Sequence, residues 1–460
     1  MAQRTAQLEL KSTTKYDTIF FDNPDILLFK NVFRRHANYS KFVSELKEVD
    51  ASDLTNTKSN DTLQEISYNI NRKGDLLTNL FLEFEVEYNH PEKEGKEFYT
   101  VDHFGNAIVR EAKFLIGDNY LVDSYQSFMK QMCKELEVKS HKTFVEPDST
   151  HGGLPSTFYA GGQHDHPRTV ITEEDKYYGD MRLVFAEIDP QKTRLEKGKY
   201  TKKFRYNFDF YFCKDYGSSF PLVSTTTQDV KIKFTLENIN NLRCKLEENS
   251  LSIKKCKIFG EYVLLDSTIK NYFISSKLDY IYLQYHSSMT KTPIKHLNGI
   301  KNITNFRGFV RDIIWGVRPG ETTISDTGPC YLKSMTGESL YKNSKTITTK
   351  IHFNGQPLYK ENSDVKTFTR DIPGKNFNNI PPLDRIGVYT FSLKPMNPQF
   401  SGLINASTIK SMTIDFNFNN NSEENKKNTF VKDDDELLIF TRNYNVLNVS
   451  GGLSATPLFI

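Results

Sequence analysis

The sequence predicts an all-β protein that contains two antiparallel β-sandwiches in tandem. Its 460 residues, with a mass of 53.2 kDa, exceed one ordinary hydrophobic core, so we expect two domains of roughly 200 residues. Many short segments alternate apolar and polar residues and are rich in aromatic and β-branched side chains. These segments recur in the same order in both halves of the chain, which indicates a duplicated fold.

Period-two alternation is clearest between residues 68 and 88, in the segment YNINRKGDLLTNLFLEFEVEY. Leu80, Leu82, Phe84 and Val86 fall on one face of an extended chain, and acidic residues dominate the other face. Similar composition predicts strands in YNFDFYFCKD (206–215), DVKIKFTLEN (229–238), DYIYLQYHS (279–287), SMTIDFNFNN (411–420) and LLIFTRNYNVLNV (437–449). Helical spacing is confined to short pieces at 24–35 and 123–136.

Two pairs of segments carry the internal repeat. AKFLIGDNYLVDSY (112–125) resembles TKIHFNGQPLYKEN (349–362), since each has a strand, a Gly-containing turn and a second short strand. YNFDFYFCKDYGSSFPL followed by DVKIKFTLEN likewise resembles VYTFSLKPMNPQFSGL followed by IKSMTIDFNFN. We interpret the chain as one β-sandwich used twice, with loops that have diverged in length.

The repeats predict a division of the chain into four parts. These are an N-terminal arm at 1–55, a first sandwich at 56–244, a charged linker at 245–255 and a second sandwich at 256–460. Two long polar stretches, 137–200 and 316–348, are rich in Gly, Pro, Ser, Thr and charge. We expect them to be loops that project from the outward end of each sandwich.

The segment FDNPDILLFKNVFRRHANYS (21–40) predicts a short amphipathic helix. Asn23 suits the N-cap, Pro24 suits the first turn, and Asp25 favours the positive end of the helix dipole. Apolar residues then recur at helical spacing, and Arg-Arg-His stands at the negative end. A helix packed under the first sandwich fits this pattern, and a nucleic-acid-binding arm would rest on three cationic residues alone.

Composition argues against several classes of protein. Sixty Lys and Arg against 57 Asp and Glu leave a net charge of only +3, whereas proteins that coat nucleic acid carry a large basic surplus. We therefore expect no specific nucleic-acid partner. The sequence shows neither a signal-peptide core nor an apolar stretch of membrane-spanning length. Five scattered cysteines without a C-x-x-C pair indicate free thiols in a reducing cytosol.

Two clusters resemble metal sites, and neither is complete. His164 and His166, with His151 nearby, would need a third converging ligand, and the flanking glycines favour a solvated loop. KDDDE (432–436) lacks the regular spacing and the Gly of an EF-hand loop, which favours a solvated acidic turn. Since no phosphate loop or G-x-S-x-G motif is present, we expect no enzyme activity, no cofactor and no metal.

Five segments together resemble the major capsid proteins of large nucleocytoplasmic DNA viruses. NPDILLFKNVFRRHANYS (23–40) is similar to that family's Asn-Pro-Gln-Ile-Thr-Phe-Phe-Lys-x-Val-Tyr-Arg-Arg-His stretch, although Asp-Ile-Leu-Leu replaces Gln-Ile-Thr-Phe. The match continues in order through ISYNINRKGDLLTNLFLEF, AKFLIGDNYLVDSY, VYTFSLKPMNPQFSGLIN and NYNVLNVSGGLS, where Asn448 replaces a frequent Arg. The resemblance spans Asn23 to Leu453, which is nearly the whole chain.

The resemblance implies two tandem eight-stranded antiparallel jelly-roll sandwiches, with three subunits forming a pseudo-hexagonal capsomer. We therefore expect a structural protein of an icosahedral virion that is assembled in the host cytoplasm. Its expected partners are two further copies, neighbouring capsomers, minor capsid proteins and an inner membrane. An assembly arm is predicted at Pro24, Phe29, Phe33, Arg34, Arg35 and His36. The alternatives are a minor capsid or scaffold paralogue and a jelly-roll carbohydrate-binding or carbohydrate-cleaving protein.

Overall fold

The structure is a computed structural model. It describes residues 38–50, 65–90, 104–117, 120–137, 198–242, 250–287, 292–293, 299–302, 308–319, 332, 348–354, 356–357, 366–378, 380–381, 385–397, 399–409, 412–417, 435–450 and 454–457.

The first sandwich consists of two antiparallel four-stranded sheets. The outer sheet has the strand order β1-β8-β3-β6, and the sheet packed against it has the order β2-β7-β4-β5. The strands are β1 (Tyr39–Glu48), β2 (Glu65–Asn69), β3 (Leu76–His90), β4 (Val109–Ile116), β5 (Tyr120–Gln126), β6 (Gly198–Asn207), β7 (Val230–Leu236) and β8 (Leu251–Leu265). The helical elements are α3 (Phe104–Ala107), α4 (Ser127–Glu137), η4 (Tyr211–Cys213), η5 (Tyr216–Ser218), η6 (Leu222–Ser224) and η7 (Ile239–Leu242).

The second sandwich repeats this plan after the helix α5 (Ser267–Ser275). Its junction sheet contains β9 (Leu278–Ser287), β18 (Glu436–Ser450), β12 (Phe309–Arg318) and β15 (Ile386–Thr390), with short additions β10 (Thr292–Pro293), β16 (Ile404–Asn405) and β19 (Ser454–Pro457). Its far sheet has the order β11-β17-β13-β14, formed by β11 (Gly299–Asn302), β17 (Met412–Asn417), β13 (Thr348–Phe353) and β14 (Gln356–Pro357). The helical elements are η9 (Thr367–Asp371), α7 (Ile372–Asn376) and η11 (Ala406–Thr408).

The duplication extends to single residues. The register of β3 against β8 shifts between Leu77 and Asn79, and the register of β12 against β18 shifts between Val310 and Asp312. Counted from this shared bulge, Asn79 is equivalent to Asp312. The paired residues Phe81 and Phe259 are then equivalent to Ile314 and Phe440. This match confirms the predicted double jelly-roll at the level of strand register.

The two Gly-containing segments form the predicted hairpins in equivalent positions. β4 and β5 are joined through Gly117, whose φ is +64°, and β13 and β14 are joined through Asn354, whose φ is +50°. Gly and Asn adopt this left-handed conformation more readily than other residues, so each repeat uses a suitable residue to turn the chain.

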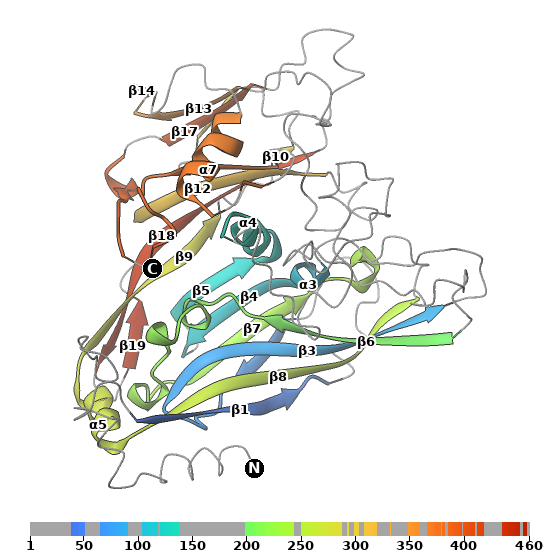
Figure 1. Ribbon diagram of the computed structural model, residues 1–460, viewed down its shortest axis with the longest axis vertical. Helices are drawn as coiled ribbons and strands as arrows, with labels where there is room; N and C mark the ends of the chain where they lie inside the picture. The colour runs from blue at the N-terminus through green and yellow to red at the C-terminus, as the bar shows by residue number, and fades with distance from the viewer. Residues whose placement is uncertain are drawn as a thin grey trace, which may run out of the picture.

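The four sheets lie one above another along the molecule. Figure 1 shows the outer sheet at one end, then the sheet containing β4, β5 and β7, then α4, the junction sheet, and the far sheet at the other end. Two apolar clusters fill these layers, one inside the second sandwich and a larger one that runs from the first sandwich to the junction sheet.

Two predicted boundaries are wrong. The predicted arm at 1–55 extends too far, because Tyr39–Glu48 form β1 and pair with β8, where Phe42 stacks on Tyr262 with ring centroids 5.5 Å apart. The predicted linker at 245–255 is wrong in its second half, because residues 251–265 form β8 between β1 and β3. The helix predicted at 123–136 begins only at Ser127, as α4, because residues 123–126 belong to β5. The helix predicted at 24–35 lies outside the described residues.

Candidate assembly surfaces

The junction sheet is buried on both of its faces. On one face of the junction sheet, Trp315 and the β12 side chains that point the same way, Ile313 and Val317, pack in the core of the second sandwich. Ile314 and Phe440 point the other way, into the apolar cluster of the first sandwich. The ring of Phe128 from α4 meets Phe440 at a centroid distance of 6.1 Å. Because large apolar side chains from both sandwiches are desolvated where they meet, this internal junction resembles a permanent interface.

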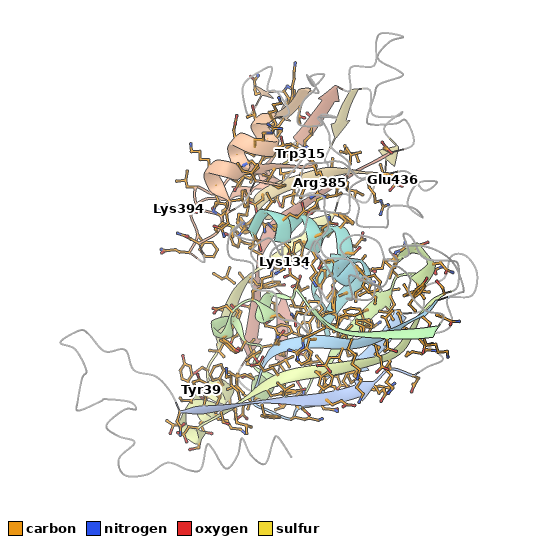
Figure 2. The ribbon with its side chains drawn as sticks, turned by 45° about the vertical axis from the view of Figure 1, so that its right-hand side comes forward. Tyr39, Lys134, Trp315, Arg385, Lys394 and Glu436 are labelled. Atoms are coloured by element: carbon orange, nitrogen blue, oxygen red, sulfur yellow. The ribbon has the colours of Figure 1, made fainter. Side chains whose placement is uncertain are left out.

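Buried ion pairs cross the same junction. Arg442 donates from Nε to Asp312 Oδ2 at 2.7 Å and also pairs with Glu137 of α4. Arg385 donates to Glu135 of α4 at 3.2 Å, and both side chains are at most 3% exposed. Figure 2 shows Arg385 at the level where α4 meets the second sandwich. Buried charges require such partners, so these pairs fix how the sandwiches sit on each other.

Two buried aspartates flank the junction on the side of the first sandwich. Burial raises the pKa of Asp123 to about 8, and its Oδ2 accepts a hydrogen bond from the backbone N–H of Tyr211 at 3.0 Å. Burial also acts to raise the pKa of Asp209, but Lys134 and Lys214, at 3.1 and 3.3 Å, outweigh it and hold that pKa well below its usual value. Asp209 is therefore an ion-pair partner, whereas burial favours the protonated form of Asp123 by raising its pKa.

A cleft of about 340 Å³ opens at the edge of this junction. Its lining contains two carboxylates, Glu137 and Asp215. Burial acts to raise the pKa of Glu137, but the Arg442 guanidinium outweighs it and holds this pKa below its usual value. A general acid in glycoside hydrolysis needs a raised pKa, so Glu137 is set for ion pairing rather than for proton donation.

The outer sheet differs from the junction sheet in its outward face. This face carries acidic residues on β3, with basic residues on β6 and mostly basic residues on β8 on either side of it. β1 contributes both signs, because Lys41, Glu45 and Lys47 are all exposed. Glu85 of β3 faces Lys203 at 3.8 Å and Lys255 at 4.0 Å. The further ion pairs on this face are Arg205–Glu83, Lys199–Glu87, Lys254–Glu87, Lys257–Glu45 and Lys257–Glu48.

One aromatic pair interrupts the charged stripes. Phe81 and Phe259 stack with centroids 5.2 Å apart, and the Arg205 guanidinium lies 4.1 Å from the Phe81 ring centroid. Neighbouring lysines remain open to solvent, with side-chain exposures of 78% for Lys203 and 57% for Lys255. The Phe81 ring is only 3% exposed because Arg205 covers it, so the solvent-facing part of this face is predominantly charged.

The second sandwich exposes apolar side chains of its own. Leu393, which follows β15, is 80% exposed, and Ile380, which follows α7, is 48% exposed. A single exposed apolar side chain needs no explanation. Leu393 and Ile380, however, lie in segments of the second sandwich whose equivalents in the first sandwich contact the junction sheet.

The sequence-predicted site residues Pro24, Phe29, Phe33, Arg34, Arg35 and His36 lie outside the described residues. The same is true of the three histidines at 151, 164 and 166, and of most of the long loops at 137–200 and 316–348. Within the described part of the chain, no group of three or more His, Cys, Asp or Glu side chains could hold a metal ion. No helix there has the length and apolar character needed to cross a membrane.

The charged junction residues were not predicted from the sequence. Arg385 and Glu135 are 250 positions apart and Arg442 and Glu137 are 305 apart, so no local spacing could reveal them. The duplication was the one available signal, because it implied that two similar sandwiches would pack together.

Comparison with known proteins agrees with the resemblance. Residues 27–284 match the family model described as the major capsid protein N-terminus, and residues 247–455 match the model for the large eukaryotic DNA virus major capsid protein. The major capsid protein of Paramecium bursaria Chlorella virus 1 is 21% identical, with 95% of each chain covered.

Solved structures share the fold. The PBCV-1 virus capsid model gives a TM-score of 0.63 at 17% identity, covering 94% of this chain and all of that one. The Faustovirus major capsid protein gives a TM-score of 0.57 at 12% identity, covering 98% and 99% of the two chains.

Proposed function

The chain belongs to the major capsid proteins of large eukaryotic DNA viruses, and from this premise we propose that it trimerises into pseudo-hexagonal capsomers of an icosahedral shell. The observation that carries the proposal is the duplicated sandwich with matching strand register. Three copies of a doubled sandwich present six similar units around one axis, and such a block tiles a hexagonal lattice. Electron microscopy of the purified protein tests this, since class averages should show a six-lobed particle with threefold symmetry.

The proposed location is the virion shell, assembled in the host cytoplasm. The proposed neighbours are other capsomers, minor capsid proteins and an inner membrane, with no nucleic acid bound specifically. The near balance of charge, 60 basic against 57 acidic residues, supports a role in protein contacts rather than in genome binding.

We propose that the segment before β1 acts as an assembly arm. Its apolar residues and its Arg-Arg-His end precede the first strand, which begins at Tyr39. Deleting residues 1–35 should leave a folded trimer and impair shell formation, because the deletion ends before Tyr39, where the first of the described strands begins. Circular dichroism and light scattering report folding and trimer mass, and electron microscopy counts shells. A truncated chain that fails to fold would place the segment in the core instead.

A further inference from the structure

A buried carboxyl group lies where the first sandwich meets the junction sheet. Asp123 is a fully buried residue of β5, which lies beside β9 (Figure 1). The backbone carbonyl of the preceding residue, Val122, accepts a hydrogen bond from the Tyr282 hydroxyl of β9 at 2.9 Å. Tyr211, whose backbone N–H donates to Asp123 Oδ2 at 3.0 Å, packs on the same Tyr282 with ring centroids 4.9 Å apart. Asp123 is therefore part of the contact between the two sandwiches.

The carboxyl group of Asp123 has no ion-pair partner within the described part of the chain. Its Oδ1 is buried and has no hydrogen-bond partner there. Lys134 and Lys214 instead pair with the neighbouring Asp209, at 3.1 and 3.3 Å. Because a buried charge without a partner is costly, this position suits a carboxyl group only in its neutral, protonated form.

Titratable groups from two other elements face Asp123. They belong to the segment that follows β6 and to β9, and they are Asp209, Tyr211, Cys213, Lys214 and Tyr282. Burial raises the pKa of Asp123 to about 8, while the Lys214 charge acts against this rise and the Asp209 charge adds to it. Burial also raises the pKa of both tyrosines and of the thiol, so these three groups stay neutral over the range in which Asp123 titrates.

We propose that Asp123 is a proton-dependent lock on the internal junction. While its carboxyl group is protonated, β9 and the segment 208–213, which follows β6, pack against β5. Loss of the proton places an unpaired charge between these elements, and the junction opens so that water can hydrate it. The contact between the two sandwiches of one chain is therefore weaker in alkaline solution.

The stability that this lock contributes falls as the pH rises. In the unfolded chain, Asp123 ionises at the ordinary pKa of an aspartate, about 3.9. In the folded chain its pKa is about 8. Between these two values the folded chain binds more protons than the unfolded chain, so each pH unit lowers the folding equilibrium constant about tenfold through this one group. Above the pKa of the folded chain the dependence levels off.

The variant Asp123→Asn tests the lock, because it removes the titration and keeps the shape of the side chain. Urea denaturation at one protein concentration, followed by the fluorescence of Trp315, gives the folding equilibrium constants of wild type and variant at each pH. Their ratio cancels the titration of groups that the two chains share. From pH 5 to pH 7, the ratio of wild type to variant should fall about a hundredfold. A fall of less than tenfold overturns the proposal.

The matched control is Asp215→Asn. Asp215 belongs to the same connection between β6 and β7, but it is exposed. The ratio of wild type to this variant should stay constant from pH 5 to pH 7. If Asp123→Asn does not fold, Asp123→Leu takes its place in the same comparison, because leucine is of similar size and carries no charge.

Hydrogen exchange of the wild type shows where the chain opens and requires no variant. Between pH 6 and pH 8, amides of β9 and of the segment 208–213 should lose protection at least tenfold, after correction for the intrinsic pH dependence of exchange. Amides of β13 and β17 in the far sheet should keep their protection. Unchanged protection at the junction, or an equal loss in the far sheet, would overturn a lock located at Asp123.

Discussion

Replacing Arg442 with methionine should lower the free energy of unfolding by about 3 kcal/mol, because Asp312 keeps only one of its two guanidinium partners and Glu137 loses its pair with Arg442. Arg442 is 1% exposed and pairs with Asp312, which is fully buried, and with Glu137 of α4. Burial acts to raise the pKa of Asp312, but Arg311 and Arg442 outweigh it and hold that pKa below its usual value. Urea denaturation at one protein concentration, followed by the fluorescence of the single tryptophan, Trp315, measures the loss.

The control for this substitution is Lys47→Met. Lys47 pairs with Asp50 at 3.3 Å, but these side chains are 45% and 66% exposed. An exposed pair contributes about 0–1 kcal/mol, so this variant should unfold almost as the wild type does. If both variants lose equally little free energy of unfolding, the Arg442 ion pairs do not hold the sandwiches together.

Replacing Phe440 with alanine should destabilise the chain by about 3–5 kcal/mol and should uncouple the two sandwiches. Phe440 is fully buried, and its ring lies 6.1 Å from Phe128 of the first sandwich and 6.1 Å from Tyr285 of β9. In the wild type, one apolar cluster joins the first sandwich to the junction sheet, so we expect a shared unfolding transition. In the variant, Trp315 fluorescence and far-ultraviolet circular dichroism should report separate transitions.

Phe400→Ala provides a matched truncation outside the junction. Phe400 contacts Tyr444 at a centroid distance of 4.7 Å and is 46% exposed, so its loss should cost much less than that of Phe440. Coincident transitions in the Phe440 variant would show that the sandwiches are coupled by contacts other than this aromatic pair.

β3 could be predicted because every second residue from Leu80 to Tyr88 is buried and hydrophobic. β18 could be predicted from its run of apolar and aromatic residues, although the first half of this strand is buried on both faces. β8 could not be predicted as a strand, because its pairing with β3 contains a β-bulge. Glu85 pairs with Lys255 and the next residue, Val86, pairs with Ile253, so Lys254 is the extra residue. The bulge places Lys254 and Lys255 side by side on solvent, which breaks the alternation and gives the segment the composition of a charged linker.

The opposite error occurred at 206–215, which alternates like a strand although β6 ends at Asn207. Phe208, Phe210 and Phe212 are all buried, but residues 208–210 belong to no strand and Phe212 lies in the 3-10 helix η4. Alternation reports burial at every second position, and strand pairing is a separate requirement.

The assembly surfaces were less predictable than the fold. The alternation of charge across the outer sheet is visible only once β8, β3 and β6 are placed in order, because β3 carries acidic residues on this face whereas β6 and most of β8 carry basic ones. The equivalence of Phe81 to Ile314 likewise depends on the bulge that both repeats share. Sequence alone shows the repeat, and the strand register shows which residues of the two sandwiches are equivalent.

The solution mass of the full-length wild-type protein tests the proposed capsid role most directly. Multi-angle light scattering at micromolar concentration and low salt should give three times the chain mass of 53.2 kDa, because interfaces of this kind hold at that concentration. A homogeneous monomer under the same conditions would contradict a capsomer-forming subunit.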